Sequence, residues 1–184
     1  MKFNLNEALD NYNPTDKNEK ESLEKIKEFL KNNDNCFSRT NLEGHITAGA
    51  LVIDENGNVL LNHHKALNKW LHFGGHSDGE SNSLNVAKRE VMEESGIVDV
   101  NDFEGKIFDV DVHTIPENHA KNEPEHYHYD IRFLFMVKNK EFKISDESKE
   151  IKWVSFKEAK KLVDSLTMKR MLEKAEQIYL NMNK

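Results

Sequence analysis

The sequence predicts an α/β fold with a mixed sheet, in which strands surround a central helix and further helices lie near both ends of the chain. Three observations support this fold class. Residues 46–53, ITAGALVI, are an apolar run typical of a buried strand, apolar residues at helical spacing follow within 84–95, and both ends of the chain carry helix signals. The length of 184 residues suits one domain, or one domain with an extension.

The N-terminal segment is predicted to be helical. Residues 13–16, NPTD, form a helix-start signal, and the apolar residues of the following LEKIKEFL recur at helical spacing. We therefore expect an amphipathic helix over residues 15–31 and a shorter one over 3–12. After residue 40 an apolar run and turn signals replace the helical pattern, so we assign residues 1–40 to an N-terminal helical extension and residues 41–184 to the main domain.

Turn signals separate the predicted strands of the main domain. A hairpin is expected over residues 46–53 and 59–63, because Asn56-Gly57 is a strong signal for a tight turn. The remaining predicted elements are a short extended piece over 70–73, a helix over 84–95, strands over 105–113, 126–138 and 150–155, and a helical tail over 156–182 that breaks near 165–167.

Charge and composition disfavour several classes of function. The formal net charge of −7 makes the chain a poor candidate for binding nucleic acid, which requires clustered lysine and arginine. An acidic protein that handles an anionic substrate would need a metal cation between the two. The single cysteine, Cys36, permits no internal disulfide and favours a reducing, cytoplasmic compartment. No apolar stretch has the length of a signal peptide or a membrane span, so no membrane partner is expected.

Residues 74–97 read GGHSDGESNSLNVAKREVMEESGI, a glycine-rich loop followed by a helix with clustered carboxylates. The glycines let the backbone turn sharply and approach a ligand closely. Glu90, Glu93 and Glu94 lie on one broad side of the helix, where like charges repel. A hard divalent cation, Mg²⁺ or Mn²⁺, would offset this repulsion through oxygen ligands. Acidic clusters on helices are usually solvated faces, but the combination with the glycine loop favours a metal site.

The same stretch resembles the Nudix box, G-x5-E-x7-R-E-U-x-E-E-x-G-U, where U is a bulky aliphatic residue. The matching positions are Gly74 and Glu80 in the first half and Arg89, Glu90, Val91, Glu93, Glu94, Gly96 and Ile97 in the second. Eight residues, not seven, separate Glu80 from Arg89, which we interpret as one extra loop residue before the helix. Glu80 can then still form an ion pair with Arg89 and pin the loop onto the helix. Counting from Gly75 would instead place Ser81 at the glutamate position.

This resemblance covers residues 45–175 and implies an α/β/α sandwich that hydrolyses a nucleoside diphosphate linked to another moiety, with Mg²⁺ or Mn²⁺. The implied metal ligands are Glu90, Glu93, Glu94 and the carbonyl of Gly74, with structural support from Glu80 and Arg89. The metal would lower the pKa of water and stabilise charge on the leaving phosphate. The catalytic base stays open among Glu90, Glu93, Glu147 and Glu150.

The strand over residues 126–135, HYHYDIRFLF, has an unusually polar face. Strand alternation puts its aromatic and aliphatic residues on a core face and His126, His128, Asp130 and Arg132 on the other. We expect substrate contacts from His126, His128 and Asp130. A His-x-His-x-Asp transition-metal site and hydrogen-bonded structural histidines stay open as alternatives. Further candidates for ligand contact, flanking the expected cleft, are His45, His72 and His76.

Two rival functions are also compatible with this fold. A diphosphate isomerase would need a catalytic cysteine, but the lone Cys36 lies before the core of the domain. A catalytically silent ligand-binding or sensor domain is disfavoured by the intact set of Glu90, Glu93 and Glu94. The expected partner is a small nucleotide-type diphosphate. The sequence leaves open which diphosphate it is, how many metal ions bind, the role of the N-terminal extension and the oligomeric state, for which a homodimer is one option.

Overall fold

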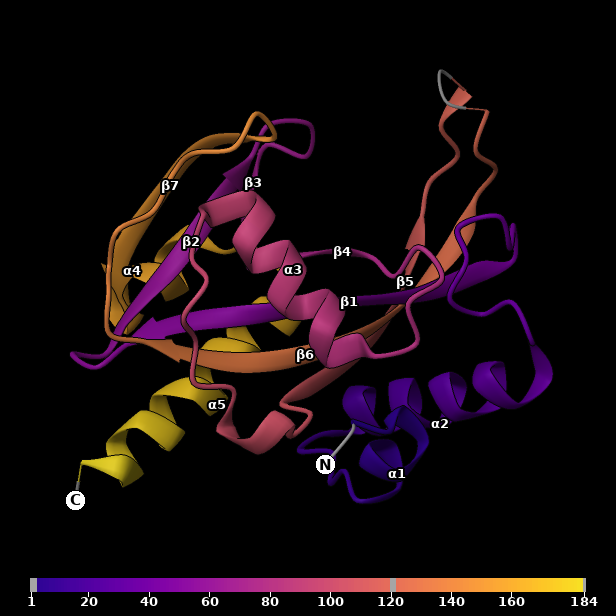
Figure 1. Ribbon diagram of the computed structural model, residues 1–184, viewed down its shortest axis with the longest axis horizontal. Helices are drawn as coiled ribbons and strands as arrows, with labels where there is room; N and C mark the ends of the chain where they lie inside the picture. The colour runs from indigo at the N-terminus through magenta and orange to yellow at the C-terminus, as the bar shows by residue number, and fades with distance from the viewer. Residues whose placement is uncertain (1–2, 120–121, 184) are drawn as a thin grey trace. The chain divides into compact units, whose positions relative to one another are not determined.

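The computed structural model describes residues 3–119 and 122–183, and within them the chain begins and ends in helices and contains a seven-stranded sheet (Figure 1). In chain order the elements are α1 (Leu5–Asp10), α2 (Lys17–Asn32), β1 (Gly44–Asp54), β2 (Asn58–His64), β3 (Lys69–Leu71), β4 (Phe73–His76), α3 (Ser83–Ser95), the 3-10 turn η1 (Phe103–Gly105), β5 (Asp109–Ile115), β6 (His126–Val137), β7 (Ser148–Ser155), α4 (Phe156–Leu162) and α5 (Leu166–Met182).

The fold class and the order of elements are those predicted, with three local differences. Helix α1 is shorter than the predicted range, because Asn4 caps its start and Asn11 ends it. Strand β5 begins at Asp109 rather than at residue 105, because all three residues of η1 have positive φ, of 50°, 64° and 68°, which no extended strand accommodates. The short extended piece over 70–73 divides into two strands, β3 and β4, with different partners.

The strand order is β3-β2-β1-β6-β5, with β4 paired to β1 and β7 paired to β2. The chain forms two compact units. The first comprises Met1–Gly49, Gly74–Ala87 and Gly105–Phe133, and the second comprises Ala50–Phe73, Lys88–Glu104 and Leu134–Lys184. Strands β1, β4 and β6, helix α3 and the turn η1 therefore contribute one part of their length to each unit.

In the first unit, helix α2 packs on the antiparallel strands β5 and β6. The register places Asp109 of β5 opposite Arg132 of β6. The ring of Phe29 in α2 stacks on the ring of Tyr129 in β6, with centroids 4.0 Å apart. The N-terminal helices thus share one compact unit with parts of the sheet, and the domain boundary placed after residue 40 stays a proposal.

In the second unit, β2 is the central strand and pairs antiparallel with β1, β3 and β7. Helix α4 begins with a capping box in which Ser155 and Glu158 bond each other's backbone amides. Helix α5 begins at an N-cap formed by Ser165. The predicted break in the C-terminal helical segment therefore falls just before residue 166.

Each unit buries a set of large apolar side chains. Fully buried side chains include Ile46 and Phe133 in the first unit and Leu60, Phe73 and Met171 in the second. Among residues 3–119 and 122–183, none of the helices has both the length and the apolar composition that crossing a bilayer requires.

The turn between β1 and β2 is organised by the buried carboxylate of Asp54. Its Oδ1 accepts hydrogen bonds from the amides of Asn56 and Asn58, both at 2.8 Å, and its Oδ2 accepts from the Asn58 side chain at 2.8 Å and pairs with Lys140. Burial alone would raise the pKa of Asp54, but these partners outweigh burial and hold that pKa below its usual value. Gly57 supplies the positive φ, 77°, which agrees with the Asn-Gly turn signal.

We predict that Asp54→Ala lowers the free energy of unfolding by about 2–3 kcal/mol, because the turn amides and the Lys140 ammonium lose a charged acceptor. The folded-state pKa of Asp54 lies below its unfolded value. Its contribution is therefore fully present above pH about 4 and is lost as the pH falls through the folded-state pKa.

Urea unfolding of the wild type and the variant, at neutral and progressively lower pH, measures both effects. Glu55→Ala, at an exposed neighbour in the same turn, is the control and should change stability by no more than about 0.5 kcal/mol. Equal effects of the two substitutions would contradict the role given to Asp54.

Candidate functional site

Gly74, the first residue of the box, lies in β4 in close contact with the backbone of β1. A Cβ atom at this position would lie 2.8 Å from Gly49 Cα and 3.0 Å from the Ala48 carbonyl oxygen, so only glycine fits without a backbone shift. The loop glycines are predicted to permit close approach to a ligand. For Gly74, the close neighbour is the backbone of β1.

The loop that follows β4 is held in a defined conformation within the first unit. Asp78 and Gly79 both have positive φ, of 50° and 89°, which turns the chain sharply before α3. The guanidinium of Arg39 donates to both carboxylate oxygens of Asp78, at 2.6 Å and 2.9 Å, and the Gly79 amide donates to the Phe37 carbonyl at 2.9 Å. The segment that precedes β1 therefore fixes the glycine-rich loop.

The loop ends in side chains that cap helix α3. Glu80 Oε1 accepts from the Asn82 amide at 2.7 Å, and Asn82 Oδ1 accepts from the Asn85 amide at 3.1 Å, so Asn82 acts as the N-cap. Residues 81 and 82 lie before the helix, where one extra loop residue is predicted. Glu80 belongs to the first unit and Arg89 to the second, and the ion pair between them stays a prediction.

Glu90, Glu93 and Glu94 lie in the C-terminal half of α3, in the second unit. The side chain of Glu90 is 13% exposed and that of Glu93 is 56% exposed, whereas Glu94 is 8% exposed as a whole residue. Arg89 Nη2 lies 2.7 Å from Glu90 Oε1, and Arg89 Nε lies 3.9 Å from Glu93 Oε1. The guanidinium therefore offsets part of the repulsion that the spacing of the carboxylates creates.

Within the described residues, two sets of side chains bring three potential metal-ligand atoms within 4.8 Å of one another. They are His45, His76 and His128, and Asp111, His113 and Asp130, all in the first unit. In this structure, the side chains of the three glutamates of α3 are not close enough together to form such a set. Their oxygen donors, at helical spacings of three and four residues, still fit a hard cation such as Mg²⁺.

Arg132 is the charged centre of the first unit. Its side chain is 5% exposed and contacts Asp109 at 3.3 Å, Asp111 at 3.0 Å and Asp130 at 2.8 Å. Burial would lower the pKa of Arg132, but the three carboxylates raise it above its usual value. Asp130 also accepts a hydrogen bond from Thr47. Asp130 thus has a structural role that competes with its predicted contact to substrate.

The histidines predicted to contact substrate are divided between the two units. His76, His126 and His128 belong to the first unit, where their ring centroids lie 4.9, 5.0 and 4.8 Å from that of His45. His72 belongs to the second unit, and its Nδ1 lies 3.4 Å from a methionine sulfur of α5. The histidines of the first unit therefore form one cluster, and His72 has a separate environment.

The opposite face of β6 is the core face, as predicted from strand alternation. Tyr129, Ile131, Phe133 and Phe135 are buried, and only Tyr127 at the start of the strand is exposed.

A sequence model described as NUDIX domain matches residues 44–175, which include the glycine-rich loop and all of α3. The chain belongs to the NUDIX domain family. It is similar to the "Probable DHNTP pyrophosphohydrolase" of Lactococcus lactis subsp. cremoris (strain MG1363), with 31% identity over 127 residues that cover 68% of this chain and 75% of the relative. The chain is therefore a Nudix hydrolase.

Solved Nudix structures share the fold. An Ap4A hydrolase of C. elegans, in a binary complex, superposes with a TM-score of 0.61 at 20% identity, over 74% of this chain and 98% of that one. The dihydroneopterin triphosphate pyrophosphohydrolase of E. coli gives a TM-score of 0.57 at 16% identity, over 74% and 95%. At these identities the likeness concerns the fold, and it confirms the predicted Nudix-like α/β architecture.

Two features of this Nudix hydrolase cannot be predicted from the Nudix-box sequence. One is the set of carboxylates around Arg132, and the other is the convergence of His45 with His76 and His128. The carboxylates around Arg132 come from its own strand, β6, and from the preceding strand, β5, whereas the three histidines come from strands that are distant in the chain. The available sequence signal is the density of polar residues on otherwise apolar strands, which indicates a polar interior but not which residues meet.

We predict that Arg132→Leu lowers the free energy of unfolding by about 3–5 kcal/mol, because three carboxylates lose the buried cation that compensates them. Arg132→Lys should recover only part of the loss, since an ammonium cannot reproduce the planar fork of donors. Chemical denaturation measures both, with the exposed Lys138→Leu as control. A loss for Arg132→Leu no larger than the control's would refute this role.

Proposed function

We propose that this Nudix hydrolase is a metal-dependent pyrophosphohydrolase that cleaves the diphosphate bond of a nucleoside diphosphate linked to another moiety. The observation that carries the proposal is the set of Glu90, Glu93 and Glu94 on α3, directly after the glycine-rich loop and inside the matched domain. The names of two similar proteins, a probable DHNTP pyrophosphohydrolase and an Ap4A hydrolase, support this reaction class.

We propose Mg²⁺ or Mn²⁺ as the cofactor, with the carboxylates of Glu90, Glu93 and Glu94 and the carbonyl of Gly74 as ligands. All four donors are oxygens, the ligand type that these hard cations prefer. When bound, the metal would lower the pKa of the attacking water and stabilise charge on the leaving phosphate. The net charge of −7 supports the need for a metal cation, because without one the acidic protein repels a multiply anionic substrate.

Arg89 is proposed as the residue that positions the carboxylates. Its contacts hold Glu90 at 2.7 Å and Glu93 at 3.9 Å, and Glu80 would support it from the loop. For the catalytic base, Glu90 and Glu93 are candidates beside Glu147 and Glu150. The latter two are exposed, and Glu150 pairs with Lys152 at 3.6 Å.

For the substrate we propose a nucleotide-type diphosphate, part of which contacts the residues that line a small pocket in the first unit. The polar lining of this pocket includes Arg39, Asn41, His45, His76, Glu123 and His126. His76 and His126 would contact the half of the substrate that is not transferred. His128, Asp130 and His72 stay candidates for such contacts, although Asp130 already accepts from Arg132.

Cys36 argues against an isomerase of the same fold. It is buried, and burial raises the pKa of its thiol, so little of the nucleophilic thiolate is present at neutral pH. A sensor without turnover is separated from the enzyme by product analysis. A screen over nucleoside triphosphates, dinucleoside polyphosphates, nucleotide sugars and dihydroneopterin triphosphate, with Mg²⁺ or Mn²⁺, tests the proposal directly.

We predict that Glu94→Gln reduces kcat by roughly 100-fold or more. Removing a metal ligand should reduce activity at least as much as removing a residue that only orients a ligand through a hydrogen bond. The melting temperature should change little, since the amide is close in size and shape. Steady-state kinetics on the best substrate of the screen measures the effect, with the exposed Glu173→Gln as the matched control. Near-normal activity of Glu94→Gln would remove the metal-site assignment.

We also predict that Mg²⁺ stabilises the folded protein by mass action. A hundredfold excess over the dissociation constant adds about 2.7 kcal/mol. The double variant Glu90→Gln, Glu93→Gln should lose most of this response, because two oxygen anions are replaced by neutral amides. Thermal unfolding with Mg²⁺ and with EDTA gives the shift. A melting temperature that is indifferent to millimolar Mg²⁺ in the wild type speaks against a carboxylate metal site.

A further inference from the structure

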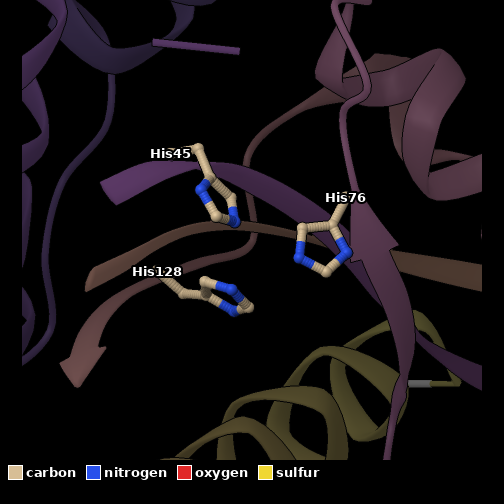
Figure 2. A group of neighbouring side chains, drawn as sticks. All are labelled: His45, His76 and His128. Atoms are coloured by element: carbon tan, nitrogen blue, oxygen red, sulfur yellow. The ribbon is translucent and has the colours of Figure 1, made fainter. Parts of the chain in front are cut away.

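Three imidazole rings from three different strands converge in the first unit. His45 comes from β1, His76 from β4 and His128 from β6, and Figure 2 shows the rings turned toward one another. One ring nitrogen of each lies within 4.8 Å of the corresponding nitrogens of the other two. Residues so distant in the chain are brought together by the pairing of β4 with β1 and by the place of β6 beside β1.

The cluster contains buried nitrogen atoms that make no hydrogen bond. His45 is 3% exposed, and within the described residues neither of its ring nitrogens has a hydrogen-bond partner. The Nε2 atom of His128 is likewise buried and unsatisfied. A neutral imidazole carries one donor and one acceptor, and leaving a buried donor or acceptor unpaired costs about 1–3 kcal/mol. Two rings in this state at one point indicate that a ligand supplies the missing interactions.

We propose that His45, His76 and His128 bind a divalent transition-metal ion, with Zn²⁺ as the best fit, through ligands distinct from the glutamates of α3. Imidazole nitrogen suits zinc and its neighbours in the first transition row, whereas Mg²⁺ and Mn²⁺ favour oxygen. The histidine site would therefore prefer zinc, whereas the carboxylate site would prefer Mg²⁺ or Mn²⁺.

The spacing of the rings matches this coordination. Their centroids are 4.9 Å apart for His45 and His76, 4.8 Å for His45 and His128, and 5.1 Å for His76 and His128. Three imidazoles on one tetrahedral ion, with Zn–N bonds of about 2.0–2.1 Å, place their centroids roughly 5 Å apart. Small rotations of the side chains are then sufficient to direct the three nitrogens at one point.

The protonation state of the rings also suits a metal ligand, which must be neutral. Burial lowers the pKa of His128 to about 3 and, together with Arg39 and His45, lowers that of His76 to about 4. Burial lowers the pKa of His45 as well. In each case burial favours the neutral form of the imidazole, which is the form that binds a cation.

Three protein ligands leave one position of a tetrahedral ion for water or a substrate group. Two of the three proposed ligands, His45 and His76, also line a pocket. The Nδ1 atom of His126 lies 2.8 Å from the Pro124 carbonyl oxygen, so Nδ1 carries the proton and donates it to that carbonyl.

The neighbouring set of Asp111, His113 and Asp130 is a weaker candidate for a metal site, because Arg132 already pairs with both carboxylates.

The test is a titration of the metal-free full-length protein with Co²⁺, a coloured substitute for Zn²⁺, in excess Mg²⁺ that saturates oxygen sites. We expect one equivalent to give the visible absorption bands of a nitrogen-bound, low-coordinate cobalt ion, and Zn²⁺ to abolish them. His76→Ala and His128→Ala should each weaken the binding of Co²⁺ by more than about 100-fold. Loss of a residue that only orients a metal ligand reduces metal affinity by roughly 10–100-fold.

Two control variants test whether the cobalt absorption bands come from the three histidines. His119→Ala removes an exposed histidine of the same unit, and Glu93→Gln removes a carboxylate of α3; both should bind cobalt as the wild type does. Absence of the bands in the wild type overturns the proposal whether or not any variant folds. So does an unchanged spectrum in folded His76→Ala, or loss of the bands in Glu93→Gln. Because metal uptake is read by absorption, the result does not depend on which substrate is hydrolysed.

Discussion

The close approach of β4 to β1 is the constraint on which both candidate sites depend. Gly74 lies so near Gly49 and the Ala48 carbonyl that any side chain there would collide with backbone. This pairing places His76, the last residue of β4, beside His45 of β1, and the loop that leads into α3 follows directly. A single glycine therefore serves two purposes. Its absent side chain allows the strand pairing, and that pairing brings together histidines that no local sequence pattern connects.

The two units present potential metal ligands of different chemical character. In the second unit, α3 presents carboxylate oxygens, with Arg89 compensating part of their charge. In the first unit, the buried histidines present nitrogens, and the neighbouring carboxylates are neutralised by Arg132. A nearby carboxylate favours protonation of an imidazole, and Asp130 acts in this sense on His128 although it also pairs with Arg132. Burial outweighs this effect and lowers the pKa of His128 to about 3, which favours the neutral form that can bind a cation.

The sequence predicts what depends on local pattern and fails where the outcome depends on which side chains become partners. The hairpin at Asn56-Gly57, the helix that carries Glu90 and the core face of β6 all follow from periodicity or turn chemistry, and the structure contains them. Alternation also predicts a polar face on β6. It does not predict that Asp130 pairs with Arg132, because residues on one strand can share a face and yet serve different partners. Likewise, HYHYD suggests a His-x-His-x-Asp metal site, but the three-histidine set combines only His128 of this strand with rings from β1 and β4.

The neutral state of the histidines bears on how an acidic protein receives a diphosphate. With a net charge of −7 and with His76 and His128 uncharged at neutral pH, the imidazoles supply no positive charge to attract phosphate. Arg39 lines the same pocket, but its guanidinium is engaged by both oxygens of Asp78. A divalent ion on the three rings would convert a neutral, poorly solvated cluster into a centre of two positive charges with an open coordination position. The same geometry that leaves His45 without hydrogen bonds would then become the means by which the pocket accepts an anionic group.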